Sequence, residues 1–164
     1  MEPGAQTLAQ GLEEPAKRLL KLAIASLARR EHSRAEIERK LRRQLRAGDD
    51  PADIGRVIAR LESRQLLSNE RMALALVRTR APRYGRLRIA QELERRGVDR
   101  ELISKVLPAA EEEAAVALAV WRSKFGTSPA THEERARQGR FLAARGFSSD
   151  VIARILARRA EMDE

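Results

Sequence analysis

Apolar residues recur at intervals of three and four along almost the whole chain, and short breaker segments separate the periodic stretches. The first stretch starts at Pro15, which suits the first turn of a helix, and carries Leu20, Ala23, Ile24 and Leu27 on one face. Aromatic residues make up only 3% of the chain, so the core must be aliphatic, and frequent Arg and Glu favour helices over sheets. The pattern predicts an all-α protein of about nine helices.

Polar residues and glycines mark the ends of these predicted helices. Ser33 with Glu36, and later Thr131 with Glu134, have the spacing of a capping box, in which a hydroxyl and a carboxylate satisfy free N–H groups. Gly97 is a natural left-handed C-cap. These signals separate the helices into groups of three.

The groups repeat with a period of 49 residues. This spacing relates equivalent glycines, cap residues and apolar residues, namely Gly48, Gly97 and Gly146; Asp50, Asp99 and Ser148; Val57, Val106 and Ile155; Ile58, Leu107 and Leu156. A nine-helix globule whose glycines align by chance is the alternative, but caps and apolar positions align together. We therefore predict an elongated tandem array of three three-helix units, at residues 15–66, 67–108 and 109–160, after a flexible N-terminal tail at residues 1–14.

The charge distribution predicts an anionic partner. The net charge is +9, and residues 29–46 and 78–96 each carry a net charge of +5, so the rest of the chain is nearly neutral. The second stretch contains the single tyrosine in a breaker segment, where it could stack on a base or a partner, or lie against its own helices. The candidate contact residues there are Arg78, Arg80, Arg83, Tyr84, Arg86 and Arg88.

The first basic stretch is either a second contact surface or a solvated helix face. Its candidate residues are Arg39, Lys40, Arg42 and Arg43.

The sequence offers no catalytic or metal-binding pattern. His32 and His132 stand at predicted helix entrances without a further ligand at metal spacing, and we interpret both as surface residues near caps. The run Glu111–Glu113 points in several directions on a helix and fits compensation of its N-terminal dipole. No cysteine, nucleophile motif, phosphate loop or membrane-length apolar segment is present. We expect a cytoplasmic protein that is not an enzyme and needs no cofactor.

Several segments, taken in order, resemble the RecX regulatory proteins of bacteria. The matching segments are 25–33 with 37–41; 66–73; 80–85, 88–89 and 92–93 leading to 96–98; and 142–148 with Ile152. The resemblance covers about residues 17–158, and its specificity lies in order and spacing. Asn69 and Met72 stand where the family often has an Asp and an aromatic residue, which affects packing more than function.

The resemblance implies a function and partners. Members of this family bind the RecA filament on single-stranded DNA, lie in its groove, and suppress strand exchange, ATP hydrolysis and coprotease activity. It therefore implies a negative regulator of homologous recombination and the SOS response, and we expect a monomer. The alternatives are a stand-alone DNA-binding protein similar to helix-turn-helix modules, and an enzyme, for which we find no site. Mixed charges on the candidate recognition helix, with Gln91, Glu94 and Arg95, argue against the former.

Overall fold

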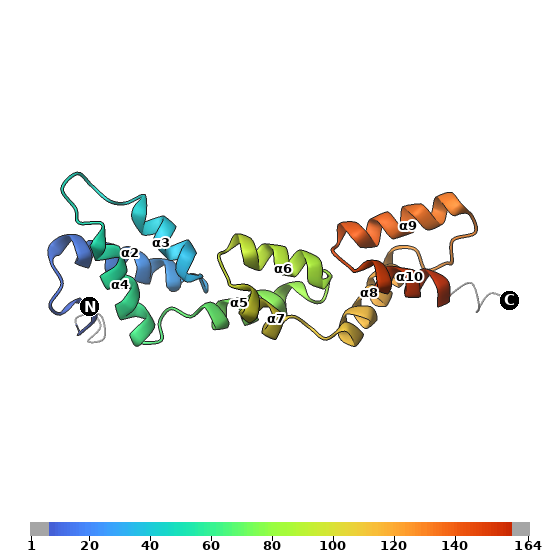
Figure 1. Ribbon diagram of the computed structural model, residues 1–164, viewed down its shortest axis with the longest axis horizontal. Helices are drawn as coiled ribbons and strands as arrows, with labels where there is room; N and C mark the ends of the chain where they lie inside the picture. Colours follow the sequence, from blue (N-terminus) through green and yellow to red (C-terminus); the bar gives the residue numbers. More distant parts are fainter. Residues whose placement is uncertain (1–6, 159–164) are drawn as a thin grey trace. The chain divides into compact units, whose positions relative to one another are not determined.

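The computed structural model describes residues 7–158 and is helical, without strands, over that range (Figure 1). A short helical turn at residues 7–9 comes first. The helices that follow are α2 (Glu14–Leu27), α3 (Arg34–Arg42), α4 (Ala52–Ser63), α5 (Asn69–Arg80), α6 (Arg86–Arg95), α7 (Arg100–Val106), α8 (Ala110–Lys124), α9 (His132–Ala144) and α10 (Ser149–Arg158). The predicted all-α fold is confirmed.

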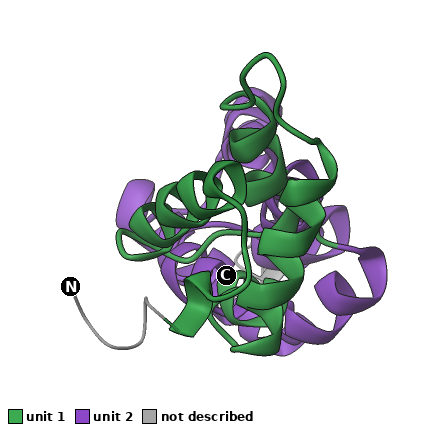
Figure 2. Cartoon of the chain, turned by 90° about the vertical axis from the view of Figure 1, so that its left-hand side faces the viewer, with its two compact units in different colours: residues 1–73, 96–98 green, residues 74–95, 99–164 purple. Residues whose placement is uncertain are grey.

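The described chain forms two compact units (Figure 2). The first contains residues 7–73 and 96–98, and the second contains residues 74–95 and 99–158. The boundary passes through α5 and assigns the residues after α6 to the first unit. The division into 15–66, 67–108 and 109–160 describes the sequence repeat, and as a division of the folded chain it stays a prediction.

In the first unit, α2, α3 and α4 pack against one another in pairs. Leu19, Ile37, Leu41, Val57 and Leu61 are completely buried between them. Burying one such side chain contributes about 1.5–3 kcal/mol, so these positions supply much of the driving force for folding this unit.

Residues 8–12 also belong to this core, although the sequence predicted a flexible tail there. Leu8 and Leu12 are buried against the three helices. Arg60 donates from Nη1 to the backbone oxygens of Leu8 and Gln10, at 2.8 and 2.6 Å. Two leucines four positions apart were too few to establish a period in the sequence, but in the fold they cover apolar surface of the bundle. Residues 1–6 of the predicted tail lie outside the described residues.

In the second unit, the core of α8, α9 and α10 is built around Trp121. Its ring is fully buried with Leu142 and Phe147. The Nε1–H of Trp121 donates to Gln138 Oε1 at 2.7 Å, and Gln138 Nε2 donates to the Thr127 carbonyl at 3.3 Å. The single tryptophan is therefore both an apolar core residue and a satisfied donor.

Four apolar positions in this unit are only partly buried. On α7 only Ile103 is buried, whereas Leu102 and Val106, and Leu107 just after the helix, remain partly exposed. The helix has seven residues, which is too short to present two full turns to a neighbour. Phe141, next to the buried Leu142, is half-buried, and its ring forms a T-shaped pair with Phe125 at 5.2 Å between centroids.

The predicted caps are largely confirmed. Ser33 and Glu36 form a complete capping box, and Asp99 accepts the Leu102 N–H at 2.9 Å. At α9, Thr131 Oγ1 accepts the Glu134 N–H as predicted. The Glu134 carboxylate instead accepts the N–H of residue 130, at 2.8 Å, so the second half of that box is displaced by one residue.

Candidate binding surface

The second basic segment lies where α5 ends and α6 begins. The Tyr84 N–H donates to the Arg80 carbonyl at 3.0 Å and closes the end of α5. The Gly85 N–H donates to the Arg145 carbonyl at 2.9 Å, which ties this loop to the end of α9. A side chain at Gly85 would overlap the backbone of Gly146, so the chain can make this approach only with glycine. The loop is thus held on both sides.

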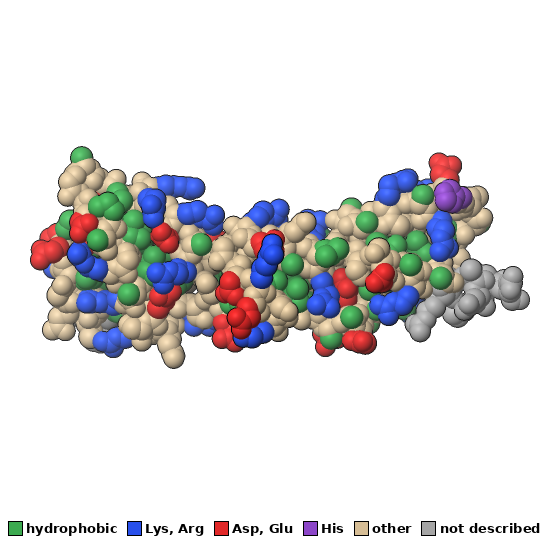
Figure 3. Space-filling model, in the orientation of Figure 1, with side chains coloured by type: hydrophobic (Ala, Val, Ile, Leu, Met, Phe, Trp, Pro, Cys, Tyr) green, Lys and Arg blue, Asp and Glu red, His purple; other side chains and the backbone are tan. Residues whose placement is uncertain are grey.

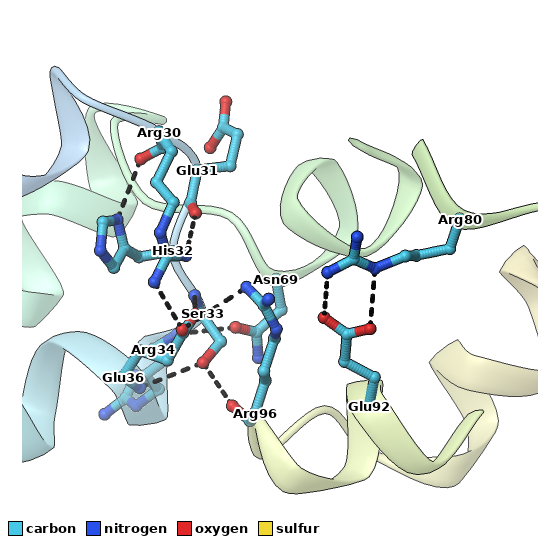
Figure 4. A network of polar contacts seen from close by, with 10 residues as sticks. All are labelled: Arg30, Glu31, His32, Ser33, Arg34, Glu36, Asn69, Arg80, Glu92 and Arg96. Carbon is cyan, nitrogen blue, oxygen red and sulfur yellow. Dashed lines mark hydrogen bonds and ion pairs between the residues drawn. The ribbon is translucent and has the colours of Figure 1, made fainter. Parts of the chain in front are cut away.

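Arg80 is occupied by an internal ion pair. Its Nε and Nη2 donate to the two carboxylate oxygens of Glu92 at 2.9 and 3.2 Å, a bidentate arrangement drawn in Figure 4. Hydrogen bonding to this carboxylate, followed by its charge, raises the pKa of Arg80. Arg80 therefore joins α5 to α6, and its role as a contact residue stays a prediction.

Tyr84 lies against its own helices on one side. The Arg88 guanidinium sits over the ring at 4.2 Å from its centroid, and Arg88 Nη1 also donates to the Ala144 carbonyl at 3.2 Å. One ring face is therefore covered by Arg88, and the side chain is half-buried.

Arg78, Arg83 and Arg86 differ from these paired residues. Arg78 and Arg83 are exposed and Arg86 is half-buried. Arg78 and Arg86 line a cavity of about 650 Å³ together with the partly exposed Val106 and Leu107.

Glu113 explains part of this arrangement. Its buried carboxylate accepts the Arg86 N–H at 2.9 Å, so a residue of α8 caps the start of α6. The sequence placed Glu113 in a run that compensates the dipole of its own helix, and the partner on α6 becomes visible only in the fold.

The first basic segment is an open helix surface. Arg39, Lys40 and Arg43 are exposed on and just after α3, and Arg42 pairs with Glu38 one turn earlier at 2.7 Å. These cations surround the C-terminal end of α3, where positive charge is favourable for the helix dipole.

A polar network at the other end of α3 was not foreseen from the sequence (Figure 4). Asn69 Oδ1 accepts the Arg34 N–H at 2.8 Å, and the Arg34 side chain pairs with Glu62 at 2.7 Å. Asn69 is the first residue of α5, a place where a polar side chain often caps its own helix. Ser68 does so instead, by accepting the Arg71 N–H at 3.1 Å, and Asn69 caps α3.

Comparison with known proteins identifies the family. Two family models match: "RecX, second three-helix domain" over residues 68–107 and "RecX, third three-helix domain" over residues 111–156. A regulatory protein RecX from Leptothrix cholodnii is 45% identical over 135 residues, which are 82% of this chain and 84% of that protein. The chain belongs to the RecX family of regulatory proteins. The RecX of Ralstonia pickettii is 39% identical, over 87% of this chain and 88% of its own.

Solved RecX structures share the fold. The crystal structure of RecX from Lactobacillus salivarius superposes with a TM-score of 0.78 at 19% identity, and covers 92% of this chain and 99% of that chain. A second RecX crystal structure gives 0.74 at 20% identity, over 92% of this chain and 74% of its own. The helical fold of this chain is thus that of the solved RecX structures.

Charge on this RecX chain is mixed at the surface. On the face shown in Figure 3, Lys and Arg side chains alternate with Asp and Glu and do not form an uninterrupted basic band. The net charge of +9 therefore does not appear on this face as one continuous basic surface.

The histidines of this RecX chain have no metal-binding geometry. His32 is partly buried, and its Nδ1 lies 2.9 Å from the Arg30 carbonyl; burial is the main cause that lowers its pKa. His132 is exposed at the start of α9. Within residues 7–158 no group of three or more His, Asp or Glu side chains could hold a metal ion. No helix in that range is long and apolar enough to cross a membrane.

Proposed function

We propose that this protein binds the RecA filament on single-stranded DNA and restrains it. In this proposal it inhibits RecA ATP hydrolysis, strand exchange and coprotease activity, and so limits homologous recombination and the SOS response. The observation that carries the proposal is the match to proteins named regulatory protein RecX across most of the chain. A partner-binding role without catalysis agrees with a surface that offers exposed arginines.

The accessible arginines are the proposed contacts. In the second unit Arg78 and Arg83 are exposed and Arg86 is half-buried, whereas Arg80 pairs with Glu92 and the exposed Arg88 lies over Tyr84. Guanidinium groups bind phosphates and carboxylates bidentately, so these residues suit both DNA and acidic protein surfaces. Arg39, Lys40 and Arg43 form a second, separate candidate surface.

The first test is RecA ATP hydrolysis stimulated by single-stranded DNA, with and without this protein, at two salt concentrations. We expect strong inhibition at near-stoichiometric amounts at both. The absence of inhibition, together with salt-sensitive binding to bare DNA, would overturn the proposal in favour of a stand-alone DNA-binding protein.

A variant series then locates the contact. Replacing Arg83, Tyr84 and Arg86 with alanine should weaken inhibition while circular dichroism shows unchanged helix content. The matched comparison is Arg39→Ala/Lys40→Ala/Arg43→Ala, which also leaves the core intact. If only this second variant loses inhibition, the contact lies on α3.

A further inference from the structure

A groove in the second unit contains cations and aromatic rings but no acidic side chain. It has a volume of about 520 Å³ and lies between the α5–α6 loop, the C-terminal half of α8 and the end of α9. The charged, polar and aromatic residues that line it are Arg83, Tyr84, Ser123, Lys124, Phe141 and Arg145. Lys124, Arg145 and Phe141 lie outside the basic stretches of the sequence and meet the loop only in the folded unit.

The groove is held in shape before any ligand binds. The Arg145 guanidinium lies over the Phe141 ring at 4.2 Å from its centroid. The backbone carbonyl of Arg145 accepts the Gly85 N–H at 2.9 Å, so the α5–α6 loop and the end of α9 form one wall of the groove. Arg88, which does not line the groove, lies over the Tyr84 ring at 4.2 Å from its centroid and restrains it. A ligand that binds here therefore orders fewer side chains than it would on a flexible surface, so less conformational entropy is lost.

The combination of side chains distinguishes between anionic ligands. An acidic peptide would use the three cations alone. A single-stranded nucleic acid also offers base faces to an aromatic wall, while its phosphates contact lysine and arginine. We propose that this groove binds single-stranded nucleic acid, with Arg83, Lys124 and Arg145 on the phosphates and a base against Tyr84 or Phe141.

This inference deepens the proposed function, because it assigns the nucleic-acid contact of a filament-bound protein to named residues. Binding to a fluorescent oligothymidine is measured by anisotropy without RecA, so the two ideas can fail separately. The test variant is Arg83→Ala/Lys124→Ala/Arg145→Ala. Arg83→Ala/Lys124→Ala, which keeps the Arg145–Phe141 contact, guards against a folding defect. The control is Arg122→Ala/Arg137→Ala/Arg154→Ala, which removes three exposed charges of the same unit outside the groove.

We expect the triple groove variant to lose at least about tenfold in affinity at low salt. The slope of log affinity against log salt should become shallower by about 2, since each phosphate contact on a single strand contributes roughly 0.7. The double variant should lose part of this affinity, and the control should stay near the wild type. Tyr84→Leu should weaken binding several-fold, whereas Tyr84→Phe keeps the ring and should not.

Three results would overturn the inference. Equal losses in the groove and control variants would mean that net charge alone attracts DNA. If the wild-type protein does not bind oligothymidine at low salt, the groove does not bind single-stranded nucleic acid. Stronger displacement of the oligonucleotide by a glutamate-rich peptide than by unlabelled oligothymidine would assign the groove to an acidic protein segment. RecA inhibition that survives in the groove variant would leave the proposed function standing while the DNA assignment is judged on anisotropy alone.

Discussion

At the scale of single residues, glycine determines where helix ends can meet. Gly97 and Gly146 have φ values of +80° and +81°, as expected for left-handed C-caps. Each has a second constraint: a side chain at Gly97 would overlap Ala35, and one at Gly146 would overlap the backbone of Arg88. Gly48 has the same backbone conformation at φ +89° but open space around it. Substitutions at these three glycines can therefore distinguish two destabilising effects: strain of a left-handed backbone, and overlap of the new side chain with neighbouring atoms.

Alanine at each glycine should therefore have graded effects. Gly48→Ala should lower the free energy of unfolding by about 1 kcal/mol, the cost of a left-handed backbone. Gly97→Ala and Gly146→Ala should lower it by roughly 3 kcal/mol, because overlap adds to that cost. Urea unfolding followed by circular dichroism measures all three. Equal losses at the three positions would show that the close approaches carry no energy.

At the scale of helices, neighbouring elements satisfy one another's ends. The N-terminus of α3 receives the Ser33 hydroxyl, the Glu36 carboxylate and the Asn69 amide, and Ser33 Oγ in turn donates to the Arg96 carbonyl. A helix leaves its first four N–H groups without partners inside the helix, so these contacts replace water at a partly buried end. The start of α6 receives Glu113 in the same way.

The carboxylate of Glu36 makes this helix end sensitive to pH. Burial opposes its charge, but hydrogen bonds from Arg30 and the Ser33 N–H outweigh burial and lower its pKa below the usual 4.5. Its contribution to stability is therefore fully present above pH 4.5 and is lost as the pH falls through the lower folded pKa. Chemical denaturation from pH 7 to 3 should show wild type and Glu36→Gln converging as the pH falls. A stability difference that stays constant over this range would contradict the cause.

Loss of the Ser33 hydroxyl tests the same end by a different route. Ser33→Ala should destabilise the protein by about 1–2 kcal/mol, at the upper end for a helix cap because the hydroxyl has two partners. Ser33→Asp should recover the acceptor for α3 but not the donor to Arg96. Comparing the unfolding free energies of the two variants separates the contributions, and identical losses would show that the Arg96 contact dominates.

At the scale of the whole molecule, each compact unit has its own apolar core. The core around Leu41 belongs to the first unit, and the core around Trp121 belongs to the second. Repeat proteins are stabilised by interactions within and between neighbouring repeats, so cooperativity need not extend over the entire chain.

Substitution in one core should therefore affect one unit more than the other. Leu41→Ala should cost about 2–5 kcal/mol in the first unit. In this variant the unfolding midpoint measured by circular dichroism should fall more than the midpoint measured by Trp121 fluorescence. Trp121 lies in the second unit and reports its unfolding. Leu142→Ala, in the Trp121 core, is the matched control and should move the fluorescence midpoint. Coincident shifts for both variants would indicate a single cooperative transition.

The sequence by itself determined the helices, most of their caps and the left-handed glycines, because these depend on residues three to four positions apart. It also indicated the family, through the order of short segments. Only the tertiary structure decided that Arg80 pairs with Glu92, that Glu113 caps α6, and that Lys124 and Arg145 join Arg83 in one groove. The partial exposure of Val106 and Leu107 is likewise visible only in the tertiary structure. These outcomes depend on which distant segments pack together, and local periodicity carries no information about that choice.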